Sequence, residues 1–349
     1  MANESVVKKL NMPLLGTTGV LAAIGLICWI MRLAQGVEVL EVSQTIPWSL
    51  YIAAFFLLVG AGGGLLIAGS LIQFGVFPAL KDHFRKLMIG AVACFIPGAI
   101  MILLDAGVPG RVFNIILSPN FTSMFVWDFI LLVLSGVLAL ALIFMKENKI
   151  LTCLAACAGT AVIIVEGLIL TNAGVAASFW HSPLIPVSFL VEGIALALAV
   201  LLIVYSKEAL DSMKGALAAC LGALLIFALV EIITVSYMGT DAAASLAILV
   251  SGSLAPLYWS QIILGLVVPI GLLLWKKGPE IVVTVAAVLA ILGVVILKMN
   301  LLIAGQAIDA FGVQAVYSPG MLELGGIIGA FGCAAFLAVL GGMLLKPKA

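Results

Sequence analysis

The chain has 349 residues, of which 64% are hydrophobic and only 9% are charged, and its formal net charge at pH 7 is zero. A mean hydropathy of +1.34 excludes a water-soluble domain of this length, because a soluble protein needs far more polar residues to cover its exterior. Without excess positive charge the chain lacks the attraction that binds phosphate backbones, so we expect no nucleic-acid partner.

Apolar segments of about 20 residues recur along the whole chain, and each is long enough to cross a hydrocarbon layer of roughly 30 Å. The sequence therefore predicts an all-α, polytopic membrane protein with one integral membrane domain over residues 1–349. The first segment follows Lys8 and Lys9 but lacks a convincing cleavage site, so we predict an uncleaved helix. About ten transmembrane helices are predicted, at approximately 12–34, 48–77, 87–107, 124–145, 150–172, 184–206, 213–238, 256–276, 280–303 and 323–345.

The basic residues predict the orientation, because cytoplasmic loops of membrane proteins accumulate Lys and Arg. Ten helices put both termini on one side, and that side holds all of the 16 basic residues except Arg32, Arg111 and Lys298. We therefore predict cytoplasmic termini. The outer loops are then 35–47, 108–123, 173–183, 239–255 and 304–322.

The second predicted helix contains the small-residue run Gly60-Ala-Gly-Gly-Gly64. Small residues at four-residue spacing let helix backbones approach closely in lipid, so plain helix packing is the simpler interpretation. A widened or unwound segment beside a ligand is the alternative that the sequence leaves open.

Six ionisable residues lie within or at the edge of predicted helices, where a buried charge is costly and indicates a cavity, a partner or a function. The helix directions place all six in the outer half of the membrane. A structural ion pair between Lys298 and one glutamate is one interpretation, but six groups at one depth favour a polar cavity that opens outward and exchanges protons. The six residues are Asp128, Glu166, Glu192, Glu231, Lys298 and Glu323.

Ligands for a redox centre are scarce. His83 and His181 are the two histidines, and both fall in predicted loops, where they cannot hold a transmembrane haem. The six cysteines all fall in apolar segments, and Cys153-x-x-x-Cys157 lacks the ligand set of an iron–sulfur or zinc site. We therefore predict no haem, no iron–sulfur cluster and no metal site in this chain.

Three motifs resemble, in the correct order, those of the NrfD/PsrC-type (polysulfide reductase-like) quinone-interacting membrane subunits. Together they extend over the second to sixth predicted helices. The motifs are Pro47-Trp48-Ser-Leu-Tyr51 with Gly60–Gly64; a loop with Asp105, Gly107, Pro109, Arg111, Pro119, Asn120, Ser123 and Trp127; and Gly167 followed by Trp180 and Pro183-Leu-Ile-Pro186.

The resemblance implies two four-helix bundles, with the first and last predicted helices as flanking additions. It also implies a quinone-reactive anchor of a respiratory oxidoreductase, as in anaerobic respiration, with menaquinone or ubiquinone as cofactor and no catalysis by this chain alone. The implied partners are a ferredoxin-like iron–sulfur subunit at the outer face and, through it, a molybdopterin catalytic subunit or a multihaem cytochrome. The lipid bilayer is the remaining partner, and the implied location is a bacterial or archaeal cytoplasmic (inner) membrane.

The expected quinone pocket lies between helices two to five, under loop 108–123, with Asp105 and Arg111 pairing to shape that loop. The family tyrosine near Gly167 is replaced by Val165-Glu166, so we expect glutamates to exchange the quinone protons and Lys298 to hold one of them ionised. The predicted quinone-binding residues are Trp48, Tyr51, Phe55, Gly60, Gly64, Asp105, Arg111 and Trp127, and the predicted catalytic residues are Glu166, Glu192, Glu231 and Lys298.

Two other functions stay open from the sequence. A secondary transporter with an outward-facing polar cavity would show broken helices and charged groups in both halves of the membrane. A purely structural anchor would carry no quinone chemistry.

Overall fold

The computed structural model describes residues 2–43, 46–145, 148–173, 178–205, 210–238, 240–275, 278–308 and 317–345. All secondary-structure elements within these ranges are helices, and ten of the helical segments are long and apolar enough to cross a membrane. The predicted all-α class and the predicted number of spans are therefore confirmed.

The helix bounds follow the hydropathy of the chain closely. The single-helix spans are α1 (Ala2–Gln35), α2 (Leu50–Gln73), α3 (Phe84–Asp105), α5 (Met124–Phe144), α6 (Lys149–Ala173), α7 (Leu184–Val204), α8 (Leu210–Met238), α12 (Glu280–Gln306) and α13 (Met321–Leu344). One further span is built from α10 (Ala255–Ser260), η5 (Gln261–Val267) and α11 (Val268–Leu274). The short connecting helices are η1 (Val37–Leu40), η2 (Pro78–His83), η3 (Pro109–Phe113), α4 (Asn114–Leu117), η4 (Ser178–Trp180) and α9 (Thr240–Val250).

Two features of the second half differ from the predicted pattern. The predicted outer loop 239–255 contains α9, whose 11 residues reach only about 16 Å at 1.5 Å per residue and cannot cross a membrane. The eighth span is not a uniform α-helix, because η5 is a seven-residue π-helix. Such widened turns are rare and occur often at functional sites.

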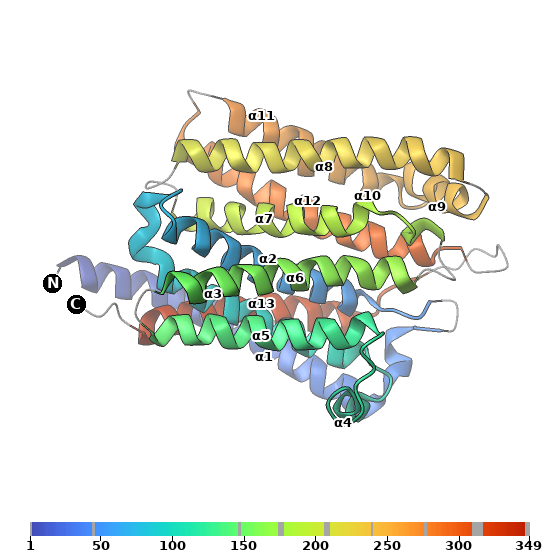
Figure 1. Ribbon diagram of the computed structural model, residues 1–349, viewed down its shortest axis with the longest axis horizontal. Coiled ribbons are helices and arrows are strands. Elements are labelled where there is room, and N and C mark those ends of the chain that lie inside the picture. The colour runs from blue at the N-terminus through green and yellow to red at the C-terminus, as the bar shows by residue number, and fades with distance from the viewer. Residues whose placement is uncertain are drawn as a thin grey trace.

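The spans form two four-helix groups with a flanking pair. The first group comprises α2, α3, α5 and α6, and the second comprises α7, α8, α12 and the α10–η5–α11 span. Contacts of α2 and α6 with α7 join the groups, and α1 packs along α13 at the edge opposite α8 and α11 (Figure 1). This arrangement agrees with two bundles plus flanking first and last helices.

The second helix, α2, lies at the centre of the molecule and is continuous through its glycine run. A Cβ atom at Gly63 would lie 2.7 Å from the Gly159 carbonyl oxygen of α6, and one at Gly64 would overlap the Gly193 carbonyl of α7. These glycines therefore let three helix backbones approach closely, which favours the packing interpretation over an unwound segment.

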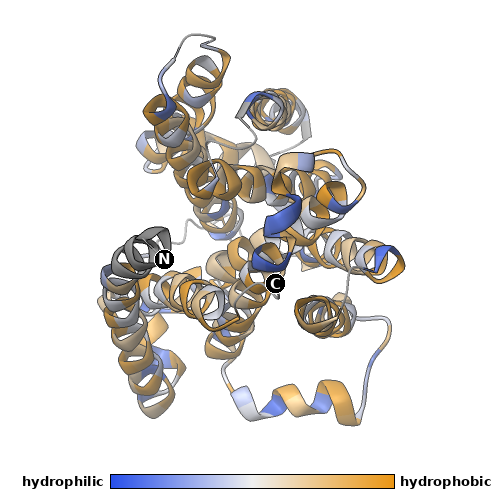
Figure 2. Cartoon of the chain, turned by 90° about the vertical axis from the view of Figure 1, so that its left-hand side faces the viewer, coloured by the Kyte–Doolittle hydropathy of each residue, from blue (hydrophilic) through white to orange (hydrophobic). Residues whose placement is uncertain are grey.

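The outward faces of the spans are apolar, as lipid contact requires (Figure 2). The helix α1 begins and α13 ends at one end of the bundle, while α4, η4 and α9 lie toward the other end (Figure 1). We refer to the end with α4, η4 and α9 as the predicted outer end, since the side of the membrane that it faces remains a prediction.

Candidate functional site

A large cavity, here called the apolar pocket, lies between α2, α3 and α5 and ends against η3 and α4. Its volume is about 780 Å³, which is within the range of about 300–1,000 Å³ that is typical of pockets for small organic ligands. It is lined by Trp48, Ile52, Val92, Phe95, Ile96, Ala99, Ile102, Leu103, Asp105, Ala106, Val108, Arg111, Val112, Phe113, Ile115, Phe125, Asp128, Phe129, Leu132, Val133, Gly136, Val137 and Leu140.

The polar residues of the apolar pocket lie near its predicted outer end. Asp105 is the last residue of α3, Arg111 lies on η3, and Asp128 lies one turn into α5. The Asp128 side chain is 3% exposed, and its Oδ1 atom has no hydrogen-bond partner within the described part of the chain. Buried polar atoms are nearly always paired, so this unpaired oxygen is unusual.

Trp48 is held rigidly at the same end of the apolar pocket. Its ring stacks on Trp180 with centroids 5.2 Å apart and meets Phe125 edge-on at 6.4 Å. Its backbone N–H donates to Oε1 of Gln306 at 2.9 Å, and Nε2 of Gln306 donates to the Trp48 carbonyl at 3.1 Å. Trp180 in turn donates to the Leu301 carbonyl. Two of the three family-like motifs therefore meet at this tryptophan pair, against α12.

The sequence predicts that Asp105 pairs with Arg111, but the structure shows Ser49 as its partner. Its Oδ1 atom accepts hydrogen bonds from the backbone N–H of Ser49 at 2.9 Å and from the Ser49 hydroxyl at 2.6 Å. Ser49 is the N-cap of α2, so Asp105 ties the end of α3 to the start of α2. The nearby cation is Arg32, which is buried and donates to the Ala106 carbonyl at 3.0 Å. Arg111 instead lies on the rim of the apolar pocket.

A second acidic side chain, from α13, also stabilises the start of α2. Glu323 of α13 accepts a hydrogen bond from the Leu50 backbone N–H at 2.6 Å and another from the Tyr317 hydroxyl. An acid at a helix N-terminus is favoured by the exposed N–H groups and the helix dipole. Burial and the neighbouring Glu323 charge raise the pKa of Tyr317 above its usual range, so this hydroxyl stays a hydrogen-bond donor.

Five of the eight predicted quinone-binding residues lie away from the apolar pocket. Tyr51 and Phe55 are fully buried in the helix core, with Tyr51 against Gly326 of α13. Gly60 and Gly64 lie on the α2–α7 contact, and Trp127 donates to the Phe121 carbonyl at 2.9 Å on the surface. The structure brings Trp48, Asp105 and Arg111 together at the apolar pocket.

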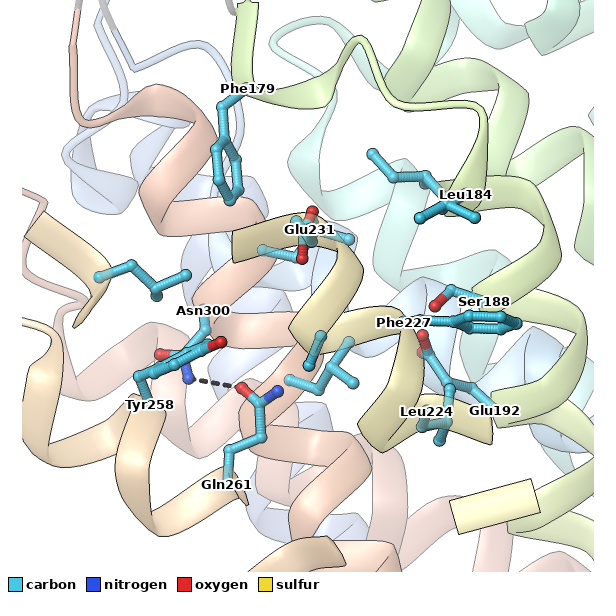
Figure 3. A pocket seen from close by; sticks show the side chains of 15 residues that line it. Phe179, Leu184, Ser188, Glu192, Leu224, Phe227, Glu231, Tyr258, Gln261 and Asn300 are labelled. Carbon is cyan, nitrogen blue, oxygen red and sulfur yellow. Dashed lines mark hydrogen bonds between the residues drawn. The ribbon is translucent and has the colours of Figure 1, made fainter. Parts of the chain in front are cut away.

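A smaller cavity, here called the polar cavity, lies in the second four-helix group (Figure 3). Its volume is about 50 Å³. It is lined by Phe179, Leu184, Ile185, Ser188, Glu192, Leu224, Phe227, Ala228, Glu231, Leu249, Tyr258, Gln261, Leu297, Asn300 and Leu301. In Figure 3, Ser188 and Glu192 lie on one side, and Nδ2 of Asn300 donates to Oε1 of Gln261 at 2.8 Å on the other.

A buried ion pair separates the polar cavity from the first four-helix group. Nζ of Lys298 lies 2.8 Å from Oε2 of Glu192, and the two side chains are 3% and 1% exposed. Lys298 also lies over the ring of Phe189. Next to this pair is Glu166 of α6, which is fully buried and whose two carboxylate oxygens have no hydrogen-bond partner among the described residues. The predicted catalytic residues therefore lie close together, with Glu192 and Glu231 on the polar cavity itself.

Sequence reasoning missed three polar residues of this region, namely Tyr258, Gln261 and Asn300. Gln261 and Asn300 could have been noticed as amide side chains inside apolar spans, because an amide in lipid needs a hydrogen-bond partner. No group of three or more His, Cys, Asp or Glu side chains suited to a metal ion occurs in the ranges that the structure describes.

Comparison with known proteins identifies the family. A stretch of 124 residues is 34% identical to a Halobacterium salinarum protein provisionally named as a membrane subunit of dimethyl sulfoxide reductase, and covers 36% of this chain and 28% of that protein. The chain thus matches less than a third of the length of this relative. The family model described as "Polysulphide reductase, NrfD" matches residues 38–310, which include every residue that lines the two cavities. Because this match covers most of its length, the chain belongs to the NrfD polysulphide reductase family.

Proposed function

We propose that this chain is the membrane anchor of a reductase complex and exchanges electrons between the quinone pool and an iron–sulfur partner subunit at the predicted outer end. Family membership and the name of the Halobacterium relative support a membrane subunit of a reductase. The single observation that carries the quinone assignment is the apolar pocket of about 780 Å³, with its aromatic walls and its few polar groups at one end.

The shape of the apolar pocket fits a quinone, which joins a flat ring with two carbonyl oxygens to a long apolar tail. From Asp128 to Leu140 the lining runs 12 residues along α5, or about 18 Å at 1.5 Å per residue. The ring would lie against Trp48 and Phe125, within reach of Asp128 and Arg111. The apolar lining farther along α3 and α5 would hold the tail.

A quinone supplies two-electron chemistry that takes up or releases two protons at its ring oxygens. The Asp128 carboxyl group belongs to a residue that lines the apolar pocket and would exchange a proton there. Arg111 adds positive charge near the same end, where negative charge would develop. Trp48 orients the ring, because it is fixed by Trp180 and Gln306.

The partner subunit is proposed to dock over η3 and α4, because this segment closes the polar end of the apolar pocket. Its outward side chains include exposed apolar groups, Phe113, Ile116 and Leu117, and α4 lies crosswise to the spans at that end (Figure 1). Exposed apolar patches rimmed by polar residues commonly mark protein or membrane contacts. An iron–sulfur cluster in the partner subunit would then lie near the quinone ring, with no other redox centre between them.

Filling the apolar pocket tests the assignment. Gly136 lines it, and a Cβ there meets no atom within 4 Å, so Gly136→Phe places a ring in the cavity without a backbone clash. We expect the purified complex to bind a quinone-analogue inhibitor at least tenfold more weakly, measured by titration of inhibitor fluorescence.

Gly222→Phe is the matched control, since its Cβ position is equally open but lies on α8, away from the apolar pocket. The control is expected to bind the analogue normally. Unchanged affinity in Gly136→Phe, with both variants assembled, would remove the quinone from this cavity.

The transporter alternative needs a polar cavity large enough for a substrate. The polar cavity of about 50 Å³ holds only a few water molecules, at roughly 10–15 Å³ of this volume each. The observed cavities therefore favour quinone chemistry, and substrate flux by this chain alone in proteoliposomes would support transport instead.

A further inference from the structure

Five ionisable side chains, four of them buried and Glu231 partly buried, form an array between the apolar pocket and the polar cavity. Asp128 lies at one end, on the apolar pocket, and Glu231 lies at the other end, on the polar cavity. Glu166, Lys298 and Glu192 lie between them, on α6, α12 and α7. The array therefore crosses from the first four-helix group to the second.

The electrostatic interactions of these side chains give their order. Glu166 interacts with Asp128 on one side and with both Lys298 and Glu192 on the other. Lys298 and Glu192 form the 2.8 Å ion pair, and Glu192 also interacts with Glu231. The helix packing gives the same order, because α6, which carries Glu166, packs against α5, which carries Asp128, and against α7, which carries Glu192.

A purely structural role does not account for this array. Asp105 and Glu323, the other two buried acids nearby, both accept hydrogen bonds at the start of α2. By contrast, Oδ1 of Asp128 and both carboxylate oxygens of Glu166 have no hydrogen-bond partner in the described part of the chain. An ion pair between Lys298 and Glu192 would need neither Asp128 nor Glu166. Acidic side chains are costly to bury inside a membrane and usually have a function there.

The polar cavity offers an end point for protons. Its volume of about 50 Å³ accommodates a few water molecules, and Oδ1 of Asn300, a residue that is 2% exposed, has no hydrogen-bond partner among the described residues. Water bound to this amide and to Glu231 would satisfy both groups. In Figure 3, Glu231 lies between Phe179 of η4 and the pair Ser188 and Glu192, on the side of the cavity nearer the predicted outer end.

We propose that Asp128, Glu166, Glu192 and Glu231, with Lys298, relay protons between the apolar pocket and water in the polar cavity. This inference rests on the proposed function, because a quinone in the apolar pocket is the source or sink of the protons. Oxidation of one quinol yields two protons and two electrons, and the iron–sulfur partner takes the electrons. Each proton enters at the Asp128 carboxylate and moves through Glu166 and Glu192 to Glu231 and to water. Reduction of the quinone uses the same route in reverse.

Lys298 has a distinct part in this relay. Its ammonium group holds the Glu192 carboxylate in place at 2.8 Å, on the wall of the polar cavity. The route runs across the bundle within its predicted outer half and crosses no further part of the membrane.

The relay is tested with Glu166→Gln in the complex purified with its native partner subunits. The substitution keeps the size of the side chain but removes its exchangeable carboxyl proton. We expect the quinone-analogue affinity to stay within twofold of the parent. Proton release after a single addition of quinol, followed with a pH-sensitive dye, should slow at least tenfold, and turnover with it.

Glu323→Gln is the matched control, because Glu323 is another buried acid in the predicted outer half of the membrane. The glutamine retains an oxygen that can accept the hydrogen bond from the Leu50 backbone N–H. This variant should release protons at the parental rate. Glu231→Gln, at the cavity end of the array, provides a second variant if Glu166→Gln does not assemble, and should also slow proton release.

The outcomes separate the two proposals. Normal proton release in both relay variants, with the analogue still bound, overturns the relay and leaves the quinone assignment in place. Absence of analogue binding in the parent complex overturns the quinone assignment itself. Slowed release in the relay variants but not in Glu323→Gln supports both.

Discussion

The Lys298–Glu192 ion pair is the clearest example of how single residues shape this protein. Both side chains are almost fully buried, and their charged atoms lie 2.8 Å apart between α12 and α7. A buried charge is tolerated when an opposite charge is close, whereas removal of one partner leaves the other uncompensated. The pair therefore joins two helices and fixes the position of the Glu192 carboxylate on the wall of the polar cavity.

The variant Lys298→Met is expected to destabilise the protein by about 3–5 kcal/mol, because it leaves the Glu192 carboxylate buried without a counter-charge. Thermal denaturation of the purified complex measures the loss. The double variant Lys298→Met with Glu192→Met replaces the pair by apolar side chains of similar size and should recover most of the stability. Equal losses in the single and double variants would show that the pairing itself contributes little.

From the sequence, single residues could be singled out where they are unusual in their surroundings, although their roles stay predictions. Glu166, Glu192 and Lys298 were identified because charges are rare in apolar spans, and the structure brings them together. Asn300 and Gln261 were not identified from the sequence, because the prediction rested on charged residues and amides carry no charge. The partner of Asp105 was wrongly expected to be Arg111, because Ser49 lies 56 positions away in the sequence and no local pattern reveals that contact.

At the scale of elements, the junction of the two four-helix groups depends on how closely α2 packs against α7. Gly64 of α2 approaches the Gly193 carbonyl of α7 so closely that a Cβ atom there would overlap it, whereas a Cβ at Gly60 meets no atom within 4 Å. The same glycine run thus contains one position that requires the absence of a side chain and one that does not.

Gly64→Ala is expected to lower the free energy of unfolding by about 1–3 kcal/mol, because overpacking pushes α2 and α7 apart. Gly60→Ala should be tolerated and serves as the control. Chemical denaturation followed by tryptophan fluorescence compares the two. If both variants are equally stable but both lose quinone-analogue binding, the glycines contact the ligand and the packing interpretation is wrong.

Hydropathy predicted the ten spans because each is a long apolar run, but it could not reveal α9 or the π-helix η5. The helix α9 is too short to cross the membrane, so it resembles a loop by length. The π-helical turn depends on local backbone geometry around Gln261, which pairs with Asn300 of a different span. Both features arise from tertiary contacts in the second four-helix group.

At the scale of the whole molecule, the two four-helix groups divide the proposed work. The first contains the apolar pocket, bounded by α2, α3 and α5, and the second contains the polar cavity, bounded by α7, α8, η5 and α12. The contacts of α2 and α6 with α7 bring the two groups together, and Glu166 lies at this junction. The resemblance of three motifs implied two bundles, and the observed helix contacts agree, but the division between two cavities emerges only in three dimensions.

The central claim is that a quinone binds in the apolar pocket of the first group. Photoaffinity labelling of the complex with an azido-quinone, followed by peptide mapping, tests it most directly. We predict labelled peptides from Val92–Asp105 of α3 and Phe125–Leu140 of α5, with labelling suppressed by excess unmodified quinone and by Gly136→Phe. Suppressible labelling confined to α7, α8 and α12 would place the quinone at the polar cavity and contradict the account.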